Sequence, residues 1–431
     1  MSLGASDSHL PVVHLEVEER LDSERSSFIY PPYVYLVVKT YRKRGNTLII
    51  SKLAKVASLA LAFGLVAGSP AYAVDLQGSG ASFPALLIEA CKAGFAASNG
   101  GANSYVYASS SSGTGQANSD KSIGDFWMSD GAYTAATKRS TLIHVPLVAA
   151  PIAVLTNLKS TKTLQLSAAT IAGIFGGTIT RWNDPLIAAD NNRTTTVVKY
   201  KLDANGNPKK DAKGNPVVLS TRKVTSVYTL PNQPITVIYR SDSSGTSENF
   251  TNYMNKSAPT IWTKAKSKVF KDGFPGDINS AANLGRVVGA ASSTGVAQLA
   301  GKTAYSITYA EVNYAVANNL KIANVINPAG SSVAPNSTGV GAFLASATQD
   351  VNGFLTFKYD TQEAGAYTLG IVSYLLADTA YPSKTTAAAV KAYATYILSS
   401  KCSGDVGAAL GFSVIDGALL AKSLAQVAKI G

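Results

Sequence analysis

Three short loops of small residues each lead into a segment that we predict to be helical. They are residues 78–83 (GSGASF), 109–115 (SSSSGTG) and 240–246 (RSDSSGT). At the start of a helix several backbone N–H groups have no partner within the helix, and serine and threonine hydroxyls add further donors. A loop of this kind can therefore bind an oxyanion without a dedicated cation.

The third loop also carries a positive charge. Arg240 has a planar guanidinium that can hold two oxygens of an oxyanion at once. One such loop is more often an ordinary helix cap or turn, because Ser, Thr and Gly are the usual residues there. Three such loops, one of them with an arginine, favour a site for a tetrahedral anion.

The sequence after residue 73 predicts alternating strands and helices that would position these loops. The strand-like runs are 104–108, 143–155, 234–239 and 305–309, and the helical segments are 84–97, 247–255 and 385–399. Such alternation indicates an α/β fold. The 431-residue chain is 46% hydrophobic and only 15% charged, which is typical of a folded protein of two or three domains.

Histidine usage argues against several kinds of catalysis. The chain has three histidines, and only His144 follows residue 73. A histidine-based metal site and a Ser-His-Asp mechanism are therefore disfavoured. We expect a binding protein with no enzymatic activity, no metal and no other cofactor.

Net charge points to an anionic ligand without pointing to nucleic acid. The formal charge is +12, which favours anions. The densest lysine group, Lys264, Lys266, Lys268 and Lys271, lacks the interleaved aromatic residues of a nucleic-acid platform. We interpret it as a solvated face and expect no nucleic-acid partner.

The region before residue 74 resembles an export signal. Lys52 and Lys55 precede an apolar run, 56–66, and residues 71–73 (AYA) match the small-x-small pattern of signal-peptidase sites. Cleavage there would start the mature chain at Val74. The run is too short to span a bilayer, and no cysteine follows the cleavage site directly, so we expect a soluble periplasmic or cell-envelope protein without a lipid anchor.

Residues 1–44 do not fit such a signal. They carry several acidic side chains and Pro31-Pro32 ahead of the basic residues that should begin it. We favour a translation start downstream of this segment, with a functional extension as the alternative.

The predicted export also bears on the two cysteines, because exported proteins fold in an oxidising compartment. Cys91 and Cys402 are the only cysteines in the chain. An even number in an oxidising compartment predicts a disulfide, which would join the start of the mature chain to its end.

One stretch has the character of an insertion. Residues 203–208 (DANGNP) are nearly repeated at 211–216 (DAKGNP). Asn-Gly and Gly-Asn-Pro are turn signals, so a protruding hairpin near 199–220 is predicted. A calcium loop is the alternative, but Gly206 lies one place too early and Gly214 occupies the position of the bidentate glutamate.

Five stretches carry a resemblance to a known family: 78–85 (GSGASFPA), 111–115 (SSGTG), 128–130 (MSD), 173–184 (GIFGGTITRWND) and 239–253 (YRSDSSGTSENFTNY). With them the chain after residue 73 resembles the periplasmic phosphate-binding protein of the high-affinity ABC phosphate importer, the PstS family. The resemblance implies a two-lobed, type II periplasmic-binding-protein fold that closes about a hinge on one phosphate. It also implies a monomer that delivers its ligand to an ABC permease.

The resemblance also implies a set of phosphate ligands. Arg240 would grip the anion and be oriented by Asp242, Asp130 would accept a hydrogen bond, and Ser111 is the alternative to Ser112 in the second loop. The implied ligands are Ser82, Phe83, Ser112, Asp130, Arg240, Ser244, Gly245 and Thr246.

The same comparison implies approximate lobe boundaries. Lobe one would comprise residues 74–150 and 321–431, and lobe two residues 151–320, so that the disulfide lies within lobe one. Two alternatives stay open: a binding protein for another tetrahedral oxyanion, and a phosphate-ester hydrolase with Ser244 as nucleophile. The hydrolase would need a base or a metal that the sequence does not supply.

Overall fold

The computed structural model describes residues 74–134, 136, 138–203, 208–212, 214 and 216–431. The predicted export signal, its cleavage site and residues 1–44 lie outside the described residues. The described residues belong to one compact unit, residues 67–431. Among them, no helix has both the length and the apolar character needed to cross a bilayer.

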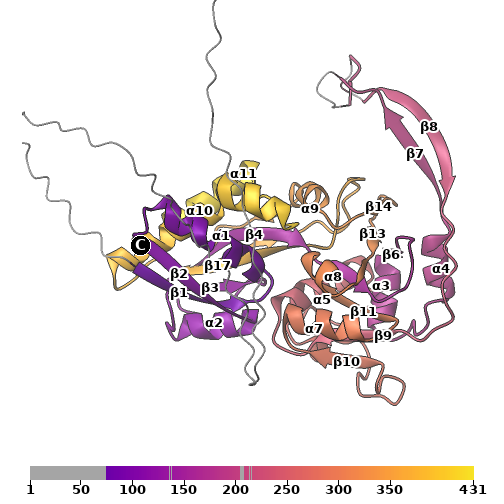
Figure 1. Ribbon diagram of the computed structural model, residues 1–431, viewed down its shortest axis with the longest axis horizontal. Coiled ribbons are helices and arrows are strands. Elements are labelled where there is room, and N and C mark those ends of the chain that lie inside the picture. The colour runs from indigo at the N-terminus through magenta and orange to yellow at the C-terminus, as the bar shows by residue number, and fades with distance from the viewer. Residues whose placement is uncertain (1–73, 135, 137, 204–207, 213, 215) are drawn as a thin grey trace, which may run out of the picture. The chain divides into compact units, whose positions relative to one another are not determined.

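The first sheet has five strands in the order β2-β1-β3-β17-β4 (Figure 1). Strands β1, β2 and β3 run parallel, and β17 runs antiparallel to β3 and β4. The strands are β1 (Val74–Ala81), β2 (Asn103–Ser110), β3 (Phe126–Ser129), β4 (Leu142–Pro151) and β17 (Gly370–Asp378), and the associated helices are α1 (Ala85–Ser98), α2 (Ser112–Asp120), α9 (Ser337–Leu344), α10 (Lys384–Ile397) and α11 (Gly417–Ala428).

The second sheet also has five strands, in the order β10-β9-β11-β5-β12. Strand β9 is parallel to β10 and β11, and β5 is antiparallel to β11 and β12. The strands are β5 (Ala153–Thr156), β9 (Thr236–Arg240), β10 (Val287–Ala290), β11 (Ser306–Ala310) and β12 (Lys321–Ile322), and the associated helices are α3 (Ala168–Phe175), α5 (Gly245–Ser257), α7 (Ser292–Lys302) and α8 (Asn313–Ala317).

Three smaller sheets complete the strand pairing. They are formed by β14 (Ser332–Val333), β13 (Asn324–Ile326) and β6 (Gln165–Ser167), by β15 (Thr348–Gln349) and β16 (Leu355–Thr356), and by β7 (Thr194–Tyr200) and β8 (Val218–Thr225). The remaining helical elements are α4 (Pro185–Asn191), α6 (Phe270–Gly273) and the π-helix η1 (Ser400–Gly407).

The predicted strand 143–155 is two strands in different sheets. Strand β4 ends at Pro151 in the first sheet, and β5 begins at Ala153 in the second. Both strands are buried on both faces, so their apolar residues form one uninterrupted run that conceals the break. The first crossing between the sheets is therefore at Ile152.

The return crossing comes later than the predicted residue 321. Lys321 and Ile322 still pair with β5, and Asn324–Ile326 pair with β6. The first sheet resumes only with β17. Strand β14 pairs with β13 in the same small sheet, so we propose lobe boundaries that assign residues up to Val333 to lobe two.

The predicted disulfide is confirmed. Cys91 in α1 and Cys402 in η1 are bonded, across a sequence separation of 311 residues. Both side chains are buried, and α1 packs against η1 and α10. The bond therefore fastens the first helix of the sheet to its last segments.

Removing this disulfide is expected to lower the free energy of unfolding by about 3 to 5 kcal/mol, because the unfolded chain would regain the freedom of a very long loop. Urea denaturation of the Cys91→Ser/Cys402→Ser variant measures the loss. Added reductant should destabilise the wild type and leave the variant unchanged. Equal midpoints for the oxidised wild type and the variant would contradict the prediction.

Candidate functional site

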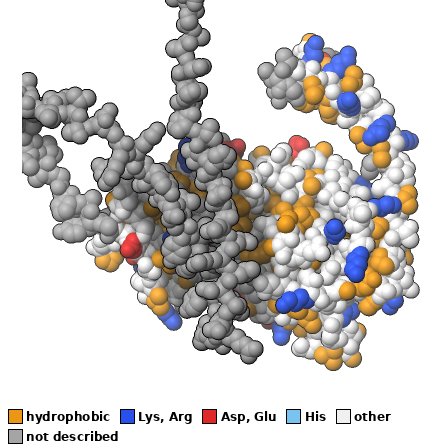
Figure 2. Space-filling view, viewed as in Figure 1, with side chains coloured by type: hydrophobic (Ala, Val, Ile, Leu, Met, Phe, Trp, Pro, Cys, Tyr) orange, Lys and Arg blue, Asp and Glu red, His pale blue; other side chains and the backbone are white. Residues whose placement is uncertain are grey.

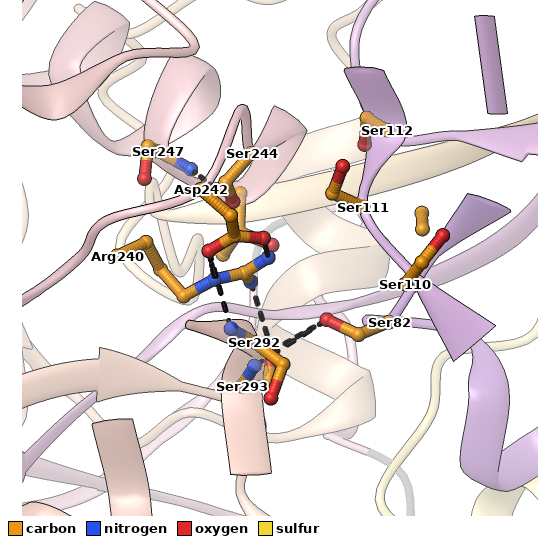
Figure 3. Close-up of polar contacts among 12 residues, drawn as sticks. Ser82, Ser110, Ser111, Ser112, Arg240, Asp242, Ser244, Ser247, Ser292 and Ser293 are labelled. Carbon is orange, nitrogen blue, oxygen red and sulfur yellow. Dashed lines mark hydrogen bonds and ion pairs between the residues drawn. The ribbon is translucent and has the colours of Figure 1, made fainter. Parts of the chain in front are cut away.

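The site lies at the carboxyl ends of three parallel strands from each of the two sheets. From the first sheet, Ser82 follows β1, Ser112 follows β2 and Asp130 follows β3. The second sheet contributes the ends of β9, β10 and β11 in the same way, with Arg240, Ser292 and Glu311. Loops at the carboxyl ends of strands are the usual place for ligands in α/β sheets. Figure 3 shows the serines of the first sheet facing Arg240 and the serines of the second.

Asp130 joins the two sheets through hydroxyl groups. Its Oδ2 accepts hydrogen bonds from Ser112 Oγ and Thr246 Oγ1, each at 3.3 Å, and its Oδ1 accepts one from Ser373 Oγ at 2.7 Å. The side chain is 3% exposed. Burial raises the pKa of Asp130 to about 6, against the opposing effect of the Ser373 hydrogen bond. Near neutral pH this carboxylate is a buried acceptor.

Arg240 is buried and held by an ion pair. Its Nε donates to Asp242 Oδ1 at 2.7 Å, and its Nη2 donates to Oδ2 of the same carboxylate. Its Nη1 donates to Ser293 Oγ at 3.2 Å. Burial lowers the pKa of Arg240, but the hydrogen bond and charge of Asp242 raise it more. The site therefore keeps a fixed positive charge, with Asp242 orienting the guanidinium.

The start of α5 lies so close to the loops of the first sheet that only glycine fits at position 245. A Cβ at Gly245 would lie 2.5 Å from Ser112 Oγ and 2.7 Å from Asp130 Cβ. Ser244 is the N-cap of α5, and its side chain accepts a hydrogen bond from the N–H of Ser247 at 3.1 Å. The free N–H groups of this first helical turn thus lie beside Asp130.

The second loop is capped as α5 is, whereas the first leads through Pro84 into α1 without a side-chain cap. Ser111 is the N-cap of α2 and accepts from Thr114 N at 3.2 Å, whereas Ser112 reaches Asp130. Phe83 is 1% exposed and packs edge-on against Phe412. Every predicted ligand therefore lies in one region of the structure.

Four further residues at the site were not predicted. Ser292 and Ser293 begin α7, and Ser293 Oγ lies 3.4 Å from Ser82 Oγ. Ser292 has φ 63°, and its N–H donates to Asp242 Oδ1 at 3.1 Å. Residues 291–295 (ASSTG) have the same composition as the three loops, so this fourth loop was detectable. The other two unpredicted residues, Ser373 and Glu311, have no comparable pattern in the sequence.

Glu311 is a second buried carboxyl group at the site. Its Oε1 accepts from Ser293 Oγ at 3.1 Å, and its Oε2 has no hydrogen-bond partner among the described residues. The residue is 2% exposed. Burial raises the pKa of Glu311 to about 8. A protonated Glu311 would place an O–H donor beside Ser293.

Glu311 is expected to make the ligand-free protein less stable as the pH rises. Its folded pKa lies above its ordinary value of 4.5, so the folded state binds more protons and stability is lost between about pH 4.5 and 8. Glu311→Gln should reduce this loss by up to about 5 kcal/mol. Urea unfolding in phosphate-free buffer at both pH values tests it. Glu89→Gln, at an exposed position of α1, is the control, and equal losses in all three proteins would refute the prediction.

Direct contacts close the site between the sheets. Gly113 N donates to the carbonyl of Ser243 at 3.0 Å, and Asn249 Nδ2 donates to the carbonyl of Asp130 at 2.6 Å. Lys266 pairs with Glu248 at 2.7 Å, and Lys268 donates to Gln116 of the first sheet's α2. Lys264, Lys266 and Lys271 are exposed, as expected for a solvated face, whereas Lys268 is half-buried against the first sheet's α2 and differs from that expectation.

Comparison with known proteins assigns the chain to a family. A family profile described as a PBP superfamily domain matches residues 66–401. PstS 2 of Mycobacterium tuberculosis is 32% identical over 259 residues, which cover 58% of this chain and 56% of the relative. PstS of Pasteurella multocida is 30% identical over 278 residues, covering 64% of this chain and 67% of the relative. The chain therefore belongs to the PBP superfamily and, within it, to the phosphate-binding proteins named PstS.

Solved structures share the fold. The crystal structure of a DING protein has a TM-score of 0.59 at 20% identity, covering 81% of this chain and 94% of that one. A periplasmic phosphate-binding protein (PfluDING), solved with phosphate bound, has a TM-score of 0.58 at 22% identity, covering 81% and 93%. The predicted α/β periplasmic-binding-protein fold is confirmed. The alignment with the mycobacterial relative spans only about half of that relative.

Proposed function

We propose that this chain is an exported solute-binding protein that captures inorganic phosphate between two lobes and delivers it to an ABC permease. The observation that carries the proposal is the buried carboxylate of Asp130 beside the buried cation of Arg240, with hydroxyl donors from both sheets around them. The names of the relatives support the same ligand. Capture would need no catalysis and no cofactor.

The proposed ligands are those that the family resemblance implied. Arg240 supplies the charge and the starts of α2 and α5 supply N–H and hydroxyl donors. Ser112 is preferred to Ser111, because Ser112 is the first residue of α2 and its hydroxyl lies 3.3 Å from Asp130 Oδ2. The complete set is Ser82, Phe83, Ser112, Asp130, Arg240, Ser244, Gly245 and Thr246.

Asp130 favours phosphate over other tetrahedral anions. Phosphate near neutral pH carries at least one O–H group, and an ionised carboxylate can only accept hydrogen bonds. Sulfate has no proton to donate, so sulfate oxygens would face the Asp130 carboxylate without a hydrogen bond between them. A fully deprotonated oxyanion is therefore the weaker candidate.

A phosphate-ester hydrolase is also the weaker candidate. His144 lies in β4, where its Nε2 accepts a hydrogen bond from the backbone N–H of Tyr133 at 3.0 Å. Burial lowers the pKa of His144 to about 3. A histidine whose acceptor nitrogen is occupied in this way is unsuited to activate Ser244.

Phosphate is expected to stabilise the folded protein by mass action. At 100 times the dissociation constant a ligand that binds only the folded state adds about 2.7 kcal/mol. Calorimetry gives the constant, and urea unfolding with and without phosphate gives the gain. An unchanged unfolding midpoint in phosphate, together with a lower midpoint in chelator, would replace this proposal with a metal-binding one.

A further inference from the structure

The hairpin of β7 and β8 follows α4 and precedes β9 in the chain, forms a two-stranded sheet of its own and extends away from the second sheet (Figure 1). Its strands pair from Thr194 opposite Thr225 to Tyr200 opposite Val218, with an irregularity beside Lys199. The hairpin is longer than the predicted 199–220, because the threonine-rich segment at its base joins the pairing. The proposed phosphate site uses none of its residues.

The hairpin is exposed along most of its length. Five of its apolar side chains are Val197, Val198, Tyr200, Val218 and Leu219, and the last two are 50% and 52% exposed. By the strand register, Val198, Tyr200 and Val218 share one face, and Val197 and Arg222 share the other. A lone two-stranded hairpin is at best marginally stable in water, so apolar groups on both faces indicate a partner.

The hairpin is also strongly basic. Residues 194–225 contain seven Lys and Arg and two Asp. Figure 2 shows basic and hydrophobic side chains side by side on this part of the surface. The described basic residues are Lys199, Lys201, Lys209, Lys210, Arg222 and Lys223.

We propose that the β7–β8 hairpin docks on the headgroups of an anionic phospholipid membrane. Cations near such a surface are attracted to it, and exposed apolar side chains enter the boundary between headgroups and acyl chains. Nucleic acid fits less well, because Tyr200 is the one aromatic residue in 194–225 and stacking platforms need several. The inference concerns a surface outside the phosphate site and does not rest on the proposed function.

Charge removal is the first test, made in the full chain so that every protein carries the same residues 1–73. Lys199→Gln/Arg222→Gln/Lys223→Gln should weaken binding to phosphatidylglycerol-rich vesicles about a hundredfold, at about fivefold per cation. The matched control removes three exposed lysines elsewhere: Lys264→Gln/Lys384→Gln/Lys422→Gln. Binding should also fall in high salt and on phosphatidylcholine vesicles.

A tryptophan placed in the hairpin reports contact of the hairpin itself with lipid, whichever other segments of the chain bind the vesicle. Tyr200→Trp should give a fluorescence signal that brominated lipid quenches, whereas Leu424→Trp, at an exposed position of α11, should not be quenched. The native tryptophans Trp127, Trp182 and Trp262 are buried and give the background. Phosphate titrations on the same variants should be unchanged, which separates this inference from the proposed function.

Three results would overturn the proposal. The first is an unquenched indole in the hairpin on anionic vesicles, and the second is equal vesicle affinity of the two triple variants. The third is a concentration-dependent dimer that the Lys199→Gln/Arg222→Gln/Lys223→Gln variant loses, which would assign the hairpin to a second copy of the chain.

Discussion

Asp130→Asn is expected to abolish most of the discrimination between phosphate and sulfate. A site that needs a ligand hydroxyl rejects an analogue without it by about 10⁴-fold, because a buried group is left unpaired. Asparagine can donate as well as accept, so the variant should lose modest affinity for phosphate and gain a large relative affinity for sulfate. Competition titrations near pH 8 on both proteins measure the ratio.

The pKa of Asp130 supplies an internal check on this result. Because its folded pKa is about 6, the wild-type carboxyl becomes protonated below that pH and can itself donate. Sulfate affinity of the wild type should therefore rise as the pH falls through 6, whereas the variant should show no such rise. Asp272→Asn, at an exposed position of α6, is the control. If the wild type already binds sulfate at pH 8, a residue other than Asp130 accepts the hydrogen bond from the phosphate O–H group.

Arg240→Ala is expected to weaken phosphate binding by about 2 to 5 kcal/mol, which is a loss of roughly 30-fold to several thousandfold in affinity. The reason is that Arg240 is 2% exposed and presents a desolvated charge held by Asp242. Arg240→Lys keeps the charge but loses the planar pairing with Asp242, so its loss should be intermediate. Calorimetry with each variant gives the values.

The control for Arg240 is Lys264→Ala, since Lys264 is exposed and outside the site. It should leave phosphate affinity nearly unchanged. Comparable losses in Arg240→Ala and Lys264→Ala would mean that the overall positive charge of the protein holds the anion, and the ligand set proposed above would have to be abandoned.

The local parts of the site were predictable because their chemistry is contained in short stretches. The loops before α2 and α5 could be recognised from residue types alone, since caps and glycines have local signatures. The disulfide partners could be paired because the chain has two cysteines only. Sequence reasoning also separated Arg240 from the surface lysines. For the caps and for Arg240, the function of the residue depends on its immediate neighbours in the chain.

The parts that escaped prediction depend on contacts far apart in the chain. Ser373 lies on the antiparallel strand β17 and reaches Asp130 across 243 positions, and Glu311 meets Ser293 only because β11 and β10 both border β9. The break at Ile152 was hidden for a related reason. A buried strand in either sheet demands the same apolar residues, so hydrophobicity cannot show where one sheet ends and the next begins.

The bond between Cys91 and Cys402 makes the intervening chain a covalent ring that contains the whole of the second sheet. A protease that cuts the exposed β7–β8 hairpin therefore opens the ring without dividing the molecule. The nicked protein should run as one species on a denaturing gel without reductant and as two fragments with it. In an oxidising compartment, the exposed β7–β8 hairpin can be cleaved while both halves of the binding site stay attached.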